Sequence, residues 1–507
     1  MQKLLTFLIK LGTFTLNKIG NGADIMDKAN LTLLTDFYEL TMMQGYYKNQ
    51  TNPTVVFDMF YRVNPNDGGY AICCGLEQVI EYIKELHFSY DDIEYLRSLD
   101  VFDEDFLDYL AGFHFTGDIY AIPEGSVIFP MEPIVKVVAP IMEAQLVETA
   151  ILCIINHQSL IATKAARVCY AAKGDPVMEF GLRRAQGPDA ATLGARAAVI
   201  GGCIGTSNVL CAKKYSLPAL GTHAHSWIMS FPDELTAFRK YAELYPNNTT
   251  LLVDTYDTLR SGVPNAIKVF EELRKKDQMP KMYGIRLDSG DLSYLSKKAR
   301  VMLDEAGFTD AIICASSDLD EYLIQSLKLQ GAAVNSWGVG TNLITSKDHP
   351  AFGGVYKLAA IKEGDEFIPK IKISENLWKI TNPGNKTIYR VYDKQSHKIH
   401  ADLICFADEV FDENEALTLF DPLSTWKKTY LEGGTYTLRE MLVPIFQNGT
   451  CVYESPSVMD IKEYCKNEQE TLWEETRRFV NPHNVYVDLS DRLWATKNDL
   501  LASHKSR

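Results

Sequence analysis

Cationic residues are scarce in this chain relative to anionic ones. Its 507 residues include 51 Lys and Arg against 66 Asp and Glu, which gives a formal net charge of −15 at pH 7. This deficit argues against a general nucleic-acid-binding protein and against a protein that binds acidic membrane surfaces. It leaves room for a local basic pocket that binds phosphate groups.

Paired cysteine motifs are also missing. The chain has ten Cys and no CxxC pair, and several of the ten lie inside apolar runs, as Cys314 does after Ile312 and Ile313. Such residues are typical of small buried side chains in a reducing compartment. The pattern argues against a disulfide framework and a zinc site, and it predicts a cytoplasmic protein.

Long apolar runs are few. The stretch 1–14 is apolar and superficially resembles a signal peptide, but Lys10 interrupts it and no small-residue cleavage site follows. A second methionine, Met26, precedes a polar segment where a soluble domain can begin. We therefore expect residues 1–26 to be an extension outside the fold. We expect no later segment to reach the length of a transmembrane helix.

The length of the chain predicts more than one domain, because 507 residues exceed what one simple core accommodates. Residues 27–142 mix helical and strand-like patterns and are expected to form an N-terminal α+β domain. Residues 143–360 are expected to form a catalytic β/α barrel of irregular outline. Residues 361–507 are expected to complete the N-terminal domain and to cap the molecule. The predicted fold class is α/β.

The middle of the chain alternates short apolar strands with helical patterns. Seven apolar segments, among them 203–204, 217–220 and 332–334, are each followed by a polar cluster. These clusters occupy 181–184, 205–208, 222–225, 254–257, 286–291, 316–318 and 335–341. The alternation is typical of parallel β/α units, and polar strand ends are what the active face of a barrel requires. Surface loops are polar too, but they do not need Arg, Asp, His and Gly at the same place in each unit.

Two histidines stand at the end of one expected strand. In the segment 221–227 (GTHAHSW), period-two geometry puts His223 and His225 on one face. Such a pair suits a metal site or phosphoryl-transfer and acid–base chemistry, and two core histidines are the alternative. A metal-dependent hydrolase needs further ligands, and no other His falls at an expected strand end. Asp254, at the next strand end, is placed to orient an imidazole, which favours chemistry on a histidine.

Other strand ends favour an anionic, phosphorylated ligand. Arg286 suits bidentate contact with a carboxylate or phosphate, and Arg183 adds positive charge. Asp288 suits ribose hydroxyls or magnesium, with a salt bridge as the alternative. The turn 338–341 (GVGT) allows close backbone approach to a phosphate and adds the Thr341 hydroxyl, unless it is only a tight turn.

Taken together, these segments resemble the nicotinate phosphoribosyltransferase family. The matching segments are 33–42 (LLTDFYELTM), 180–189 (FGLRRAQGPD), 221–226 (GTHAHS), 253–256 (VDTY), 285–291 (IRLDSGD) and 338–341 (GVGT). They extend over residues 31–357, and the C-terminal tail also resembles that of the family. Any one segment is weak evidence, whereas the joint set is specific.

The resemblance implies an enzyme that joins nicotinate to phosphoribosyl pyrophosphate, giving nicotinate mononucleotide and pyrophosphate in NAD salvage. Members of the family couple this reaction to ATP hydrolysis through a phosphohistidine, and the family's Ala-His-Ser motif falls on His225. His223 lies outside that motif. Magnesium is expected to help hold the departing pyrophosphate. The resemblance further implies a homodimer with shared active sites, and neither a nucleic acid nor a membrane is an expected partner.

The resemblance also assigns residues to the nicotinate end of the site. Phe180 and Tyr38 are expected to stack on the pyridine ring, and Tyr38 is a residue that a partner subunit can supply. Arg286 and Thr222 are expected to contact the nicotinate end or a nearby phosphate. Related nicotinamide enzymes have Gly-Thr-Asp where this chain has Gly-Thr-Ser, ending at Ser207. A serine can donate to a carboxylate that an aspartate repels, so Ser207 favours nicotinate.

The remaining assignments concern ribose and phosphate. Asp288 is expected to meet the ribose, and Arg183 to hold phosphates. The 5′-phosphate is expected at Gly338, Gly340 and Thr341. Two other hypotheses remain open at this point: a metal-dependent barrel hydrolase that uses the histidine pair, and a catalytically silent nucleotide-binding protein.

Overall fold

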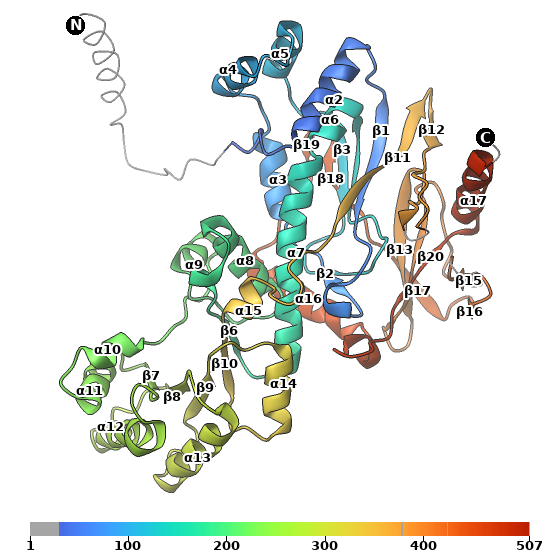
Figure 1. Cartoon of the computed structure of the whole chain (residues 1–507). Coiled ribbons are helices and arrows are strands. Elements are labelled where there is room, and N and C mark those ends of the chain that lie inside the picture. The colour runs from blue at the N-terminus through green and yellow to red at the C-terminus, as the bar shows by residue number, and fades with distance from the viewer. Residues whose placement is uncertain (1–29, 377–378, 423, 506–507) are drawn as a thin grey trace, which may run out of the picture.

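The computed structural model describes residues 30–376, 379–422 and 424–505, and the expected extension 1–26 lies outside them. Figure 1 shows a long central helix, α7 (Glu148–Ala171), with a lobe carrying a parallel sheet at one end and β-rich layers beside it. Buried apolar side chains form two main cores. One surrounds the parallel sheet and its helices, and the other lies between the N-terminal helices and an antiparallel sheet.

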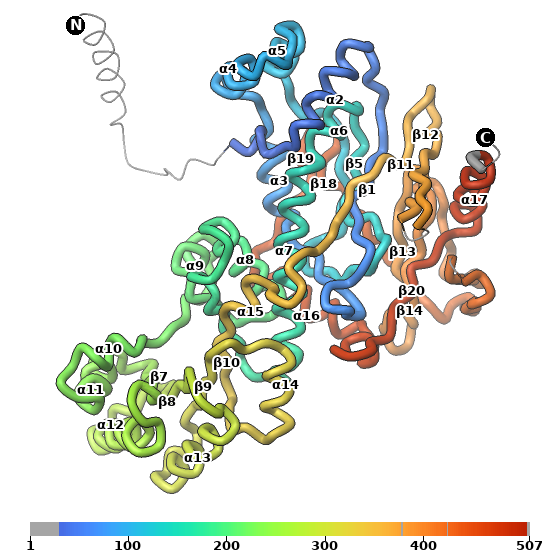
Figure 2. Tube along the Cα trace, viewed as in Figure 1, coloured from blue at the N-terminus to red at the C-terminus, as the bar shows by residue number. Residues whose placement is uncertain are grey.

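Early and late parts of the chain share that antiparallel sheet, whose strand order is β12-β11-β1-β5-β3-β18-β19. The strands are β1 (Thr54–Phe60), β3 (Asp118–Ala121), β5 (Val135–Pro140), β11 (Val355–Glu363), β12 (Glu366–Pro369), β18 (Val443–Gln447) and β19 (Thr450–Cys451). Figure 2 shows β11 beside β1 and β18 among the early elements. β1 lies between β5 and β11 and is buried over six of its seven residues, which explains its nearly continuous apolar run.

Short helices accompany this sheet. They are α2 (Phe37–Lys48), α3 (Leu76–Glu85), α4 (Tyr90–Ser98), α5 (Glu104–Ala111) and α6 (Ile141–Leu146). A small antiparallel pair of strands, β2 (Ala71–Ile72) and β4 (Val127–Ile128), contacts α7 and α16 (Val458–Glu470) instead. α4 begins with a reciprocal capping box between Ser89 and Asp92, which satisfies backbone N–H groups that the first turn leaves unpaired. α2 begins after Asp36, where the sequence predicts a helix start.

The helical stretch Ile141–Ala171 is long and apolar enough to cross a membrane, which corrects the expectation that no later segment reaches that length. It comprises α6 and α7, and 67% of its most apolar window is buried inside the structure. α7 packs against α3, α8 (Pro188–Ile200), α14 (Glu321–Leu329) and α15 (Thr341–Ile344). The stretch is therefore a buried core helix, and its apolar character follows from neighbours on several sides.

The middle region forms a five-stranded parallel sheet of order β6-β10-β9-β8-β7. Its strands are β6 (Val177–Glu179), β7 (Asn248–Leu252), β8 (Met282–Leu287), β9 (Ile312–Ala315) and β10 (Ser336–Val339). The helices of this region include α9 (Val209–Tyr215), α10 (His225–Met229), α11 (Glu234–Leu244), α12 (Val263–Lys275) and α13 (Leu292–Glu305). The predicted alternation of apolar strands and helices is therefore present.

Three expected strands differ from the prediction. The segments 203–204 and 217–220 form no strand. Two isolated parallel bridges stand in their place, Glu179 to Thr206 and Thr206 to Ala219, so the first lies beyond the segment 203–204. The third expected strand, 332–334, is displaced toward the C-terminus, to Ser336–Val339. The N–H of its first residue, Ala332, donates to the Leu327 carbonyl of α14 at 3.0 Å and so belongs to the end of that helix. Strand pairing therefore begins only at Ser336.

The C-terminal region adds a second antiparallel layer. The sheet order is β17-β13-β14-β20, with β15 and β16 paired separately. The elements are β13 (Lys386–Asp393), β14 (Ile399–Phe406), β15 (Leu417–Phe420), β16 (Lys428–Leu431), β17 (Tyr436–Glu440), β20 (Tyr486–Leu489), α16 (Val458–Glu470) and α17 (Asp491–Lys505). Within it, the fully buried Arg390 donates to both carboxylate oxygens of Asp402, so the charge of this arginine is neutralised inside the layer.

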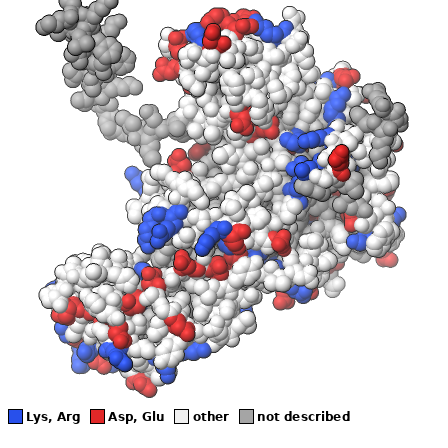
Figure 3. All heavy atoms as spheres, viewed as in Figure 1, with Lys and Arg blue, Asp and Glu red and all other residues white. Residues whose placement is uncertain are grey.

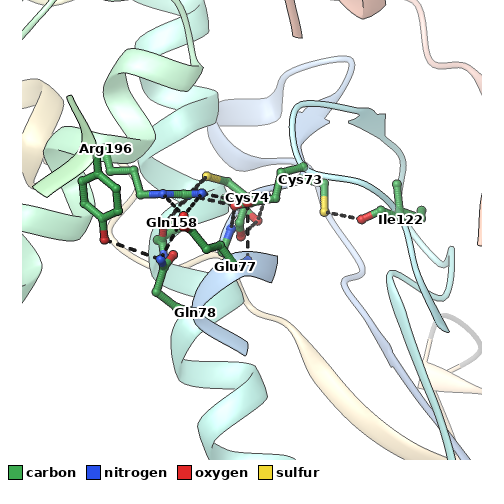
Figure 4. Close-up of polar contacts among 11 residues, drawn as sticks. Cys73, Cys74, Glu77, Gln78, Ile122, Gln158 and Arg196 are labelled. Atoms are coloured by element: carbon green, nitrogen blue, oxygen red, sulfur yellow. Dashed lines mark hydrogen bonds and ion pairs between the residues drawn. The ribbon is translucent and has the colours of Figure 1, made fainter. Parts of the chain in front are cut away.

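A buried polar cluster ties α8 to the N-terminal region (Figure 4). Arg196 is fully buried, and its guanidinium donates to both Glu124 carboxylate oxygens at 2.9 and 2.8 Å. It also donates to Glu77 at 2.9 Å and to Gln158 Oε1 at 3.1 Å. Burial disfavours the charged Glu124 carboxyl, but Arg196 and backbone N–H groups outweigh it, so the pKa of Glu124 is lowered. We refer to these four residues as the Arg196 cluster.

Candidate active site

Most of the expected site residues line one pocket at the C-terminal ends of the parallel strands. Its volume is about 400 Å³. Nine residues expected from the sequence line it: Phe180, Arg183, Ser207, Thr222, Arg286, Asp288, Gly338, Gly340 and Thr341. Because the carboxyl ends of parallel strands meet at one edge of a sheet, side chains distant in the sequence converge there.

Arg286 is the centre of the polar contacts in this pocket. Its Nη1 donates to Thr222 Oγ1 at 2.5 Å, its Nε to Ser316 Oγ at 3.0 Å, and its Nη2 to Asp288 Oδ1 at 3.3 Å. The Ser316 hydroxyl also donates to Asp288. Burial acts to raise the pKa of Asp288, but the Ser316 hydrogen bond and the Arg286 charge outweigh it, so this pKa is lowered. We call these four residues the Arg286 cluster. The sequence predicts three of them and misses Ser316.

His225 lies beside this cluster at the first position of α10. Its side chain is 40% exposed, and its Nε2 is 3.9 Å from Asp288 Oδ2. Its Nδ1 is 3.0 Å from the Thr255 hydroxyl. From the sequence we expected Asp254 to orient this imidazole. Instead, Asp254 Oδ2 accepts hydrogen bonds from the Asp288 N–H at 2.8 Å and the Ser289 hydroxyl at 2.7 Å, and the neighbouring Thr255 contacts His225.

His223 has a different environment from His225, so the expected common face is wrong. The residues around them form an irregular connection before α10 rather than a strand, and period-two geometry does not apply. His223 is 7% exposed, and its Nε2 accepts a hydrogen bond from the Leu252 N–H at 3.2 Å. Burial lowers the pKa of His223 to about 4. The described residues hold no group of three or more His, Cys, Asp or Glu suited to a metal ion.

The glycines of the turn 338–341 have a local packing role. A Cβ on Gly338 would lie 2.6 Å from a carbon of the Phe180 ring, and a Cβ on Gly340 would lie 3.2 Å from the Phe180 carbonyl oxygen. The absence of side chains here therefore makes room for Phe180 against β10. This packing role adds to the expected one, the close approach of a phosphate. The two roles are compatible, because both Gly338 and Gly340 also line the pocket.

A buried carboxylate shapes the loop that follows Phe180. Glu179 is fully buried and accepts hydrogen bonds from the Gly181 N–H and from Thr206 Oγ1, the latter at 2.5 Å. The Ser207 N–H donates to the Glu179 carbonyl at 2.9 Å. Glu179 therefore connects the loop of Phe180 to the loop of Ser207. The sequence shows Glu179 only as one polar residue in an apolar strand, so its role was missed.

Arg183 and Arg184 are exposed at the rim of the pocket, in a short 3-10 helix, Leu182–Arg184. Among the described residues, neither has a recorded ion pair. On the face shown in Figure 3, Lys and Arg gather next to Asp and Glu where the lobe of α10–α13 meets the rest of the molecule. Two guanidinium groups without an ion pair of their own in the described structure therefore stand at the rim, which suits a phosphate.

Of the expected site residues, Tyr38, His225 and Asp254 do not line the pocket. His225 and Asp254 contact Asp288 of its wall, whereas Tyr38 lies elsewhere. It belongs to α2, is 45% exposed, and forms a side-chain hydrogen bond with Glu148. Burial and the neighbouring carboxylates Glu148 and Glu39 raise its pKa. Within the part of the chain described, the pocket is therefore built without Tyr38.

Comparisons with known proteins support the same assignment over most of the chain. The model described as "Nicotinate phosphoribosyltransferase (NAPRTase) family" matches residues 176–395. The models of the family's N-terminal and C-terminal domains match residues 33–156 and 385–497. A nicotinate phosphoribosyltransferase of Bacillus subtilis is 46% identical over 479 residues, covering 94% of this chain and 96% of the relative. The human protein of the same name is 30% identical over 529 residues, covering 93% and 96%.

Solved structures agree with the sequence relatives. Human nicotinic acid phosphoribosyltransferase superposes with a TM-score of 0.80 at 27% identity, covering 92% of this chain and 99% of that one. A nicotinate-nucleotide pyrophosphorylase from Pyrococcus furiosus has a TM-score of 0.67 at 24% identity, covering 90% and 99%, and shows the likeness of fold alone. The fold is mixed α/β with several sheets, one of them parallel. On its sequence relatives, its matching domains and its fold, the chain belongs to the nicotinate phosphoribosyltransferase family.

Proposed function

We propose that the chain transfers the phosphoribosyl group of phosphoribosyl pyrophosphate to nicotinate, forming nicotinate mononucleotide and pyrophosphate in NAD salvage. The transfer is coupled to ATP hydrolysis through a phosphohistidine at His225. Membership of the family supports the reaction class. The observation that carries the proposal is the single pocket in which Phe180, Arg286 and Asp288 meet beside His225.

The pocket suits an aromatic acid. Phe180 offers an apolar ring face for a pyridine. The Arg286 guanidinium has one carboxylate partner, Asp288, at 3.3 Å, and its other two contacts are hydroxyls. It therefore keeps much of its attraction for a carboxylate of the substrate. Ser207 can donate a further hydrogen bond, and it places no negative charge against the acid.

The transfer itself needs positioning and charge stabilisation. The nicotinate ring nitrogen attacks the anomeric carbon of the ribose while the bond to pyrophosphate breaks. Pyrophosphate leaves with the bonding electrons, and the positive charge ends on the pyridine ring. Asp288, whose pKa is lowered, presents a carboxylate to the ribose as its cationic character develops. Arg183 at the rim and Gly340 and Thr341 at the turn hold phosphate groups.

The carboxylates of the site fit the expected magnesium ion. Asp254 Oδ1 is buried and has no hydrogen-bond partner among the described residues. Asp288 is held in its ionised form by Ser316 and Arg286. Carboxylate oxygens are the ligands that Mg²⁺ prefers, and the ion would neutralise part of the charge on pyrophosphate. Asp254 and Asp288 are the residues that would hold it.

The contacts of His225 favour one of its nitrogens for phosphorylation. In our proposal Nδ1–H donates to the Thr255 hydroxyl, 3.0 Å away, which leaves the lone pair on Nε2. Nε2 attacks the γ-phosphorus of ATP, the N–P bond forms, and ADP leaves with the electrons of the broken P–O bond. Water later cleaves the N–P bond and releases phosphate. The bound phosphoryl group adds a charge of about −1.5 to −2 next to the pocket.

We extend the proposal to the assembly and the fold. Tyr38 is exposed on α2 and away from its own pocket, so in a homodimer the partner's Tyr38 completes the pyridine site. The parallel sheet, prolonged by the bridges at Thr206 and Ala219, acts as an irregular β/α barrel spanning residues 143–360. Residues 27–142 form the N-terminal domain, and residues 361–507 complete it and cap the molecule. The enzyme acts in the cytoplasm, without nucleic-acid or membrane partners.

A single incubation tests the reaction. The purified chain is mixed with nicotinate, phosphoribosyl pyrophosphate, Mg²⁺ and ATP, and products are identified by mass. We expect nicotinate mononucleotide and pyrophosphate, with ADP formed in step. Binding of phosphoribosyl pyrophosphate without turnover would instead indicate a silent nucleotide-binding protein. A stoichiometric transition metal bound by His223 and His225 would indicate the hydrolase.

A variant tests the phosphohistidine. His225→Ala is expected to abolish stimulation by ATP and incorporation of γ-phosphate, while the circular dichroism spectrum is unchanged. Thr255→Val is the matched control, because it removes the hydrogen bond to Nδ1 and keeps the imidazole. It should retain phosphorylation at a reduced rate. Full coupling to ATP in His225→Ala would exclude the proposed role.

A further inference from the structure

The strand β7 forms an open edge of the parallel sheet. Among the described strands it pairs only with β8. Just beyond its end, the Val253 N–H donates to the Arg286 carbonyl of β8 at 3.2 Å. Successive N–H groups of a strand point to opposite sides, so the Leu252 N–H points to the open edge. Leu252 is fully buried, and a buried N–H without an acceptor is costly.

The opposite edge of the sheet, beyond β6, is irregular. There the ladder continues only through single bridges at Thr206 and Ala219. Two residues after Ala219 the chain enters the segment 221–225, which carries Thr222 into contact with Arg286 and ends at His225. No backbone hydrogen bond is recorded between this segment and β7 in the described residues. The two edges therefore approach each other without a ladder.

The His223 ring occupies the gap between the edges. Its Nε2 accepts the Leu252 N–H at 3.2 Å, and the ring packs edge-on against Tyr241 with centroids 4.6 Å apart. A ring nitrogen that accepts a hydrogen bond carries no proton, so the neutral ring has its proton on Nδ1. Burial lowers the pKa of His223 to about 4, which keeps the ring neutral at physiological pH.

We propose that His223 is a positioning residue whose Nε2 replaces a strand carbonyl, tying the segment 221–225 to β7 and thereby holding Thr222 against Arg286. This inference deepens the proposed function and rests on it for its kinetic consequences. The same hydrogen bond fixes the end of β7, where Asp254 accepts from Asp288 and Ser289 and where Thr255 contacts His225. One buried hydrogen bond thus sets the distance between the loop of His225 and the loops that face it.

The first test uses the unaltered protein and needs no activity. In protein with ¹⁵N-labelled histidine, the shifts of the His223 ring should show a neutral Nδ1–H tautomer at pH 7. The Leu252 amide should exchange with deuterium slowly, although it lies at a sheet edge. A proton on Nε2 would overturn the inference whether or not the chain makes nicotinate mononucleotide. If the tautomer is as expected and no product forms, the proposed function fails alone.

The second test compares two substitutions at the same position. His223→Gln keeps an acceptor that can reach the Leu252 N–H, and His223→Leu keeps the volume without the acceptor. We expect His223→Leu to raise KM for nicotinate about tenfold with a smaller change in kcat, and to speed exchange of the Leu252 amide at least tenfold. His223→Gln should restore both values to within about threefold of the unaltered chain. Equal impairment in the two variants, or unchanged values in His223→Leu, would overturn the inference.

Discussion

The molecule contains two arginine clusters that use their charge in opposite ways. In the Arg196 cluster, the guanidinium is fully buried and meets two carboxylates, Glu124 and Glu77, and the amide of Gln158. In the Arg286 cluster, the guanidinium meets one carboxylate and two hydroxyls at the wall of a pocket of about 400 Å³. The first arginine is saturated with anionic partners, and the second retains attraction for one more anion.

The difference teaches what to look for in a buried arginine. A fully paired guanidinium contributes to the arrangement of helices, because removing either partner leaves a buried charge without compensation. A guanidinium whose partners are hydroxyls has its hydrogen bonds satisfied, but its positive charge is hardly neutralised. A substrate carboxylate can therefore supply the missing negative charge. Partner chemistry, more than burial, separates the structural arginine from the functional one.

The largest expected effect, a loss in the free energy of unfolding, follows from breaking the Arg196 cluster. Arg196→Met leaves the buried Glu124 carboxylate without a cation, and we expect a loss of about 3–5 kcal/mol in the free energy of unfolding. Urea unfolding followed by circular dichroism measures it. The double variant Arg196→Met with Glu124→Gln removes both charges and should recover part of the loss. A single variant within about 1 kcal/mol of the unaltered chain would contradict this view of the cluster.

The next largest effect, a loss in kcat/KM, follows from breaking the Arg286 cluster without unfolding the protein. Arg286→Ala should lower kcat/KM for nicotinate by about 10²–10³-fold, the cost of removing one oriented charged donor. Its free energy of unfolding should change by less than about 1 kcal/mol. Arg286→Lys is the matched control, because it keeps the charge and loses the forked geometry. Its kcat/KM should lie between that of Arg286→Ala and that of the unaltered chain. Steady-state kinetics paired with urea unfolding separates these outcomes, and a large loss of stability would make Arg286 a structural residue.

Mild acid should distinguish the two clusters. The pKa of Glu124 is lowered beside Arg196, so its stabilising charge is present above the unfolded value near 4.5 and is lost only as pH falls through the folded value. The pKa of His223, beside the second cluster, is lowered to about 4. Its unfolded form gains a proton below about pH 6.5 while the folded form stays neutral, so stability falls between pH 6.5 and about 4, by about 2 kcal/mol at pH 5.

The measurement is unfolding by urea at several pH values in the unaltered chain and in His223→Gln. The charges that face His223 are Arg286 and His225, which both disfavour its protonation, and Tyr241 packs against the ring. The stability lost between pH 6.5 and 5 should shrink in His223→Gln, because glutamine does not titrate. The same loss in both proteins would assign the acid sensitivity to other groups.

The smallest expected effect concerns the preference of the pocket for nicotinate over nicotinamide. Ser207→Asp adds a negative charge to the pocket, and repulsion of the nicotinate carboxylate should lower the ratio of nicotinate to nicotinamide use about tenfold, or about 1.4 kcal/mol. Ser207→Asn is the control of similar size without the charge. Competition between the two substrates, with products separated by mass, gives the ratio. An unchanged ratio in Ser207→Asp would refute the account of acid selectivity.

Much of the pocket could be predicted from local pattern. Arg286 and Asp288 follow an apolar segment that becomes β8, and Phe180 closes the apolar segment that becomes β6. Thr341 follows β10, which forms further along the chain than the expected segment 332–334. Position at the end of a parallel strand is enough to bring such side chains to one edge, as the pocket lining confirms. The long apolar stretch before residue 172 was underestimated, because periodicity cannot tell a buried core helix from a membrane-spanning one.

Other parts depended on contacts between distant loops. His223 and His225 do not share a face, because the segment that carries them has no strand neighbour to extend it. Thr255, rather than Asp254, contacts His225. Gly338 is required by the Phe180 ring packed against it. Each of these outcomes depends on which loop lies opposite, and sequence spacing carries no information about that.

The sequence by itself determined the family, the alternation of strands and helices, and the identity of most side chains that line the pocket. Tertiary structure alone decided how those side chains are partnered, which arginine is saturated, and which histidine is buried as a hydrogen-bond acceptor. The physical reason is range. Hydrophobic periodicity and strand ends arise from neighbours along the chain, whereas hydrogen bonds such as those of His223 and Arg286 require segments far apart in sequence to meet within about 3 Å.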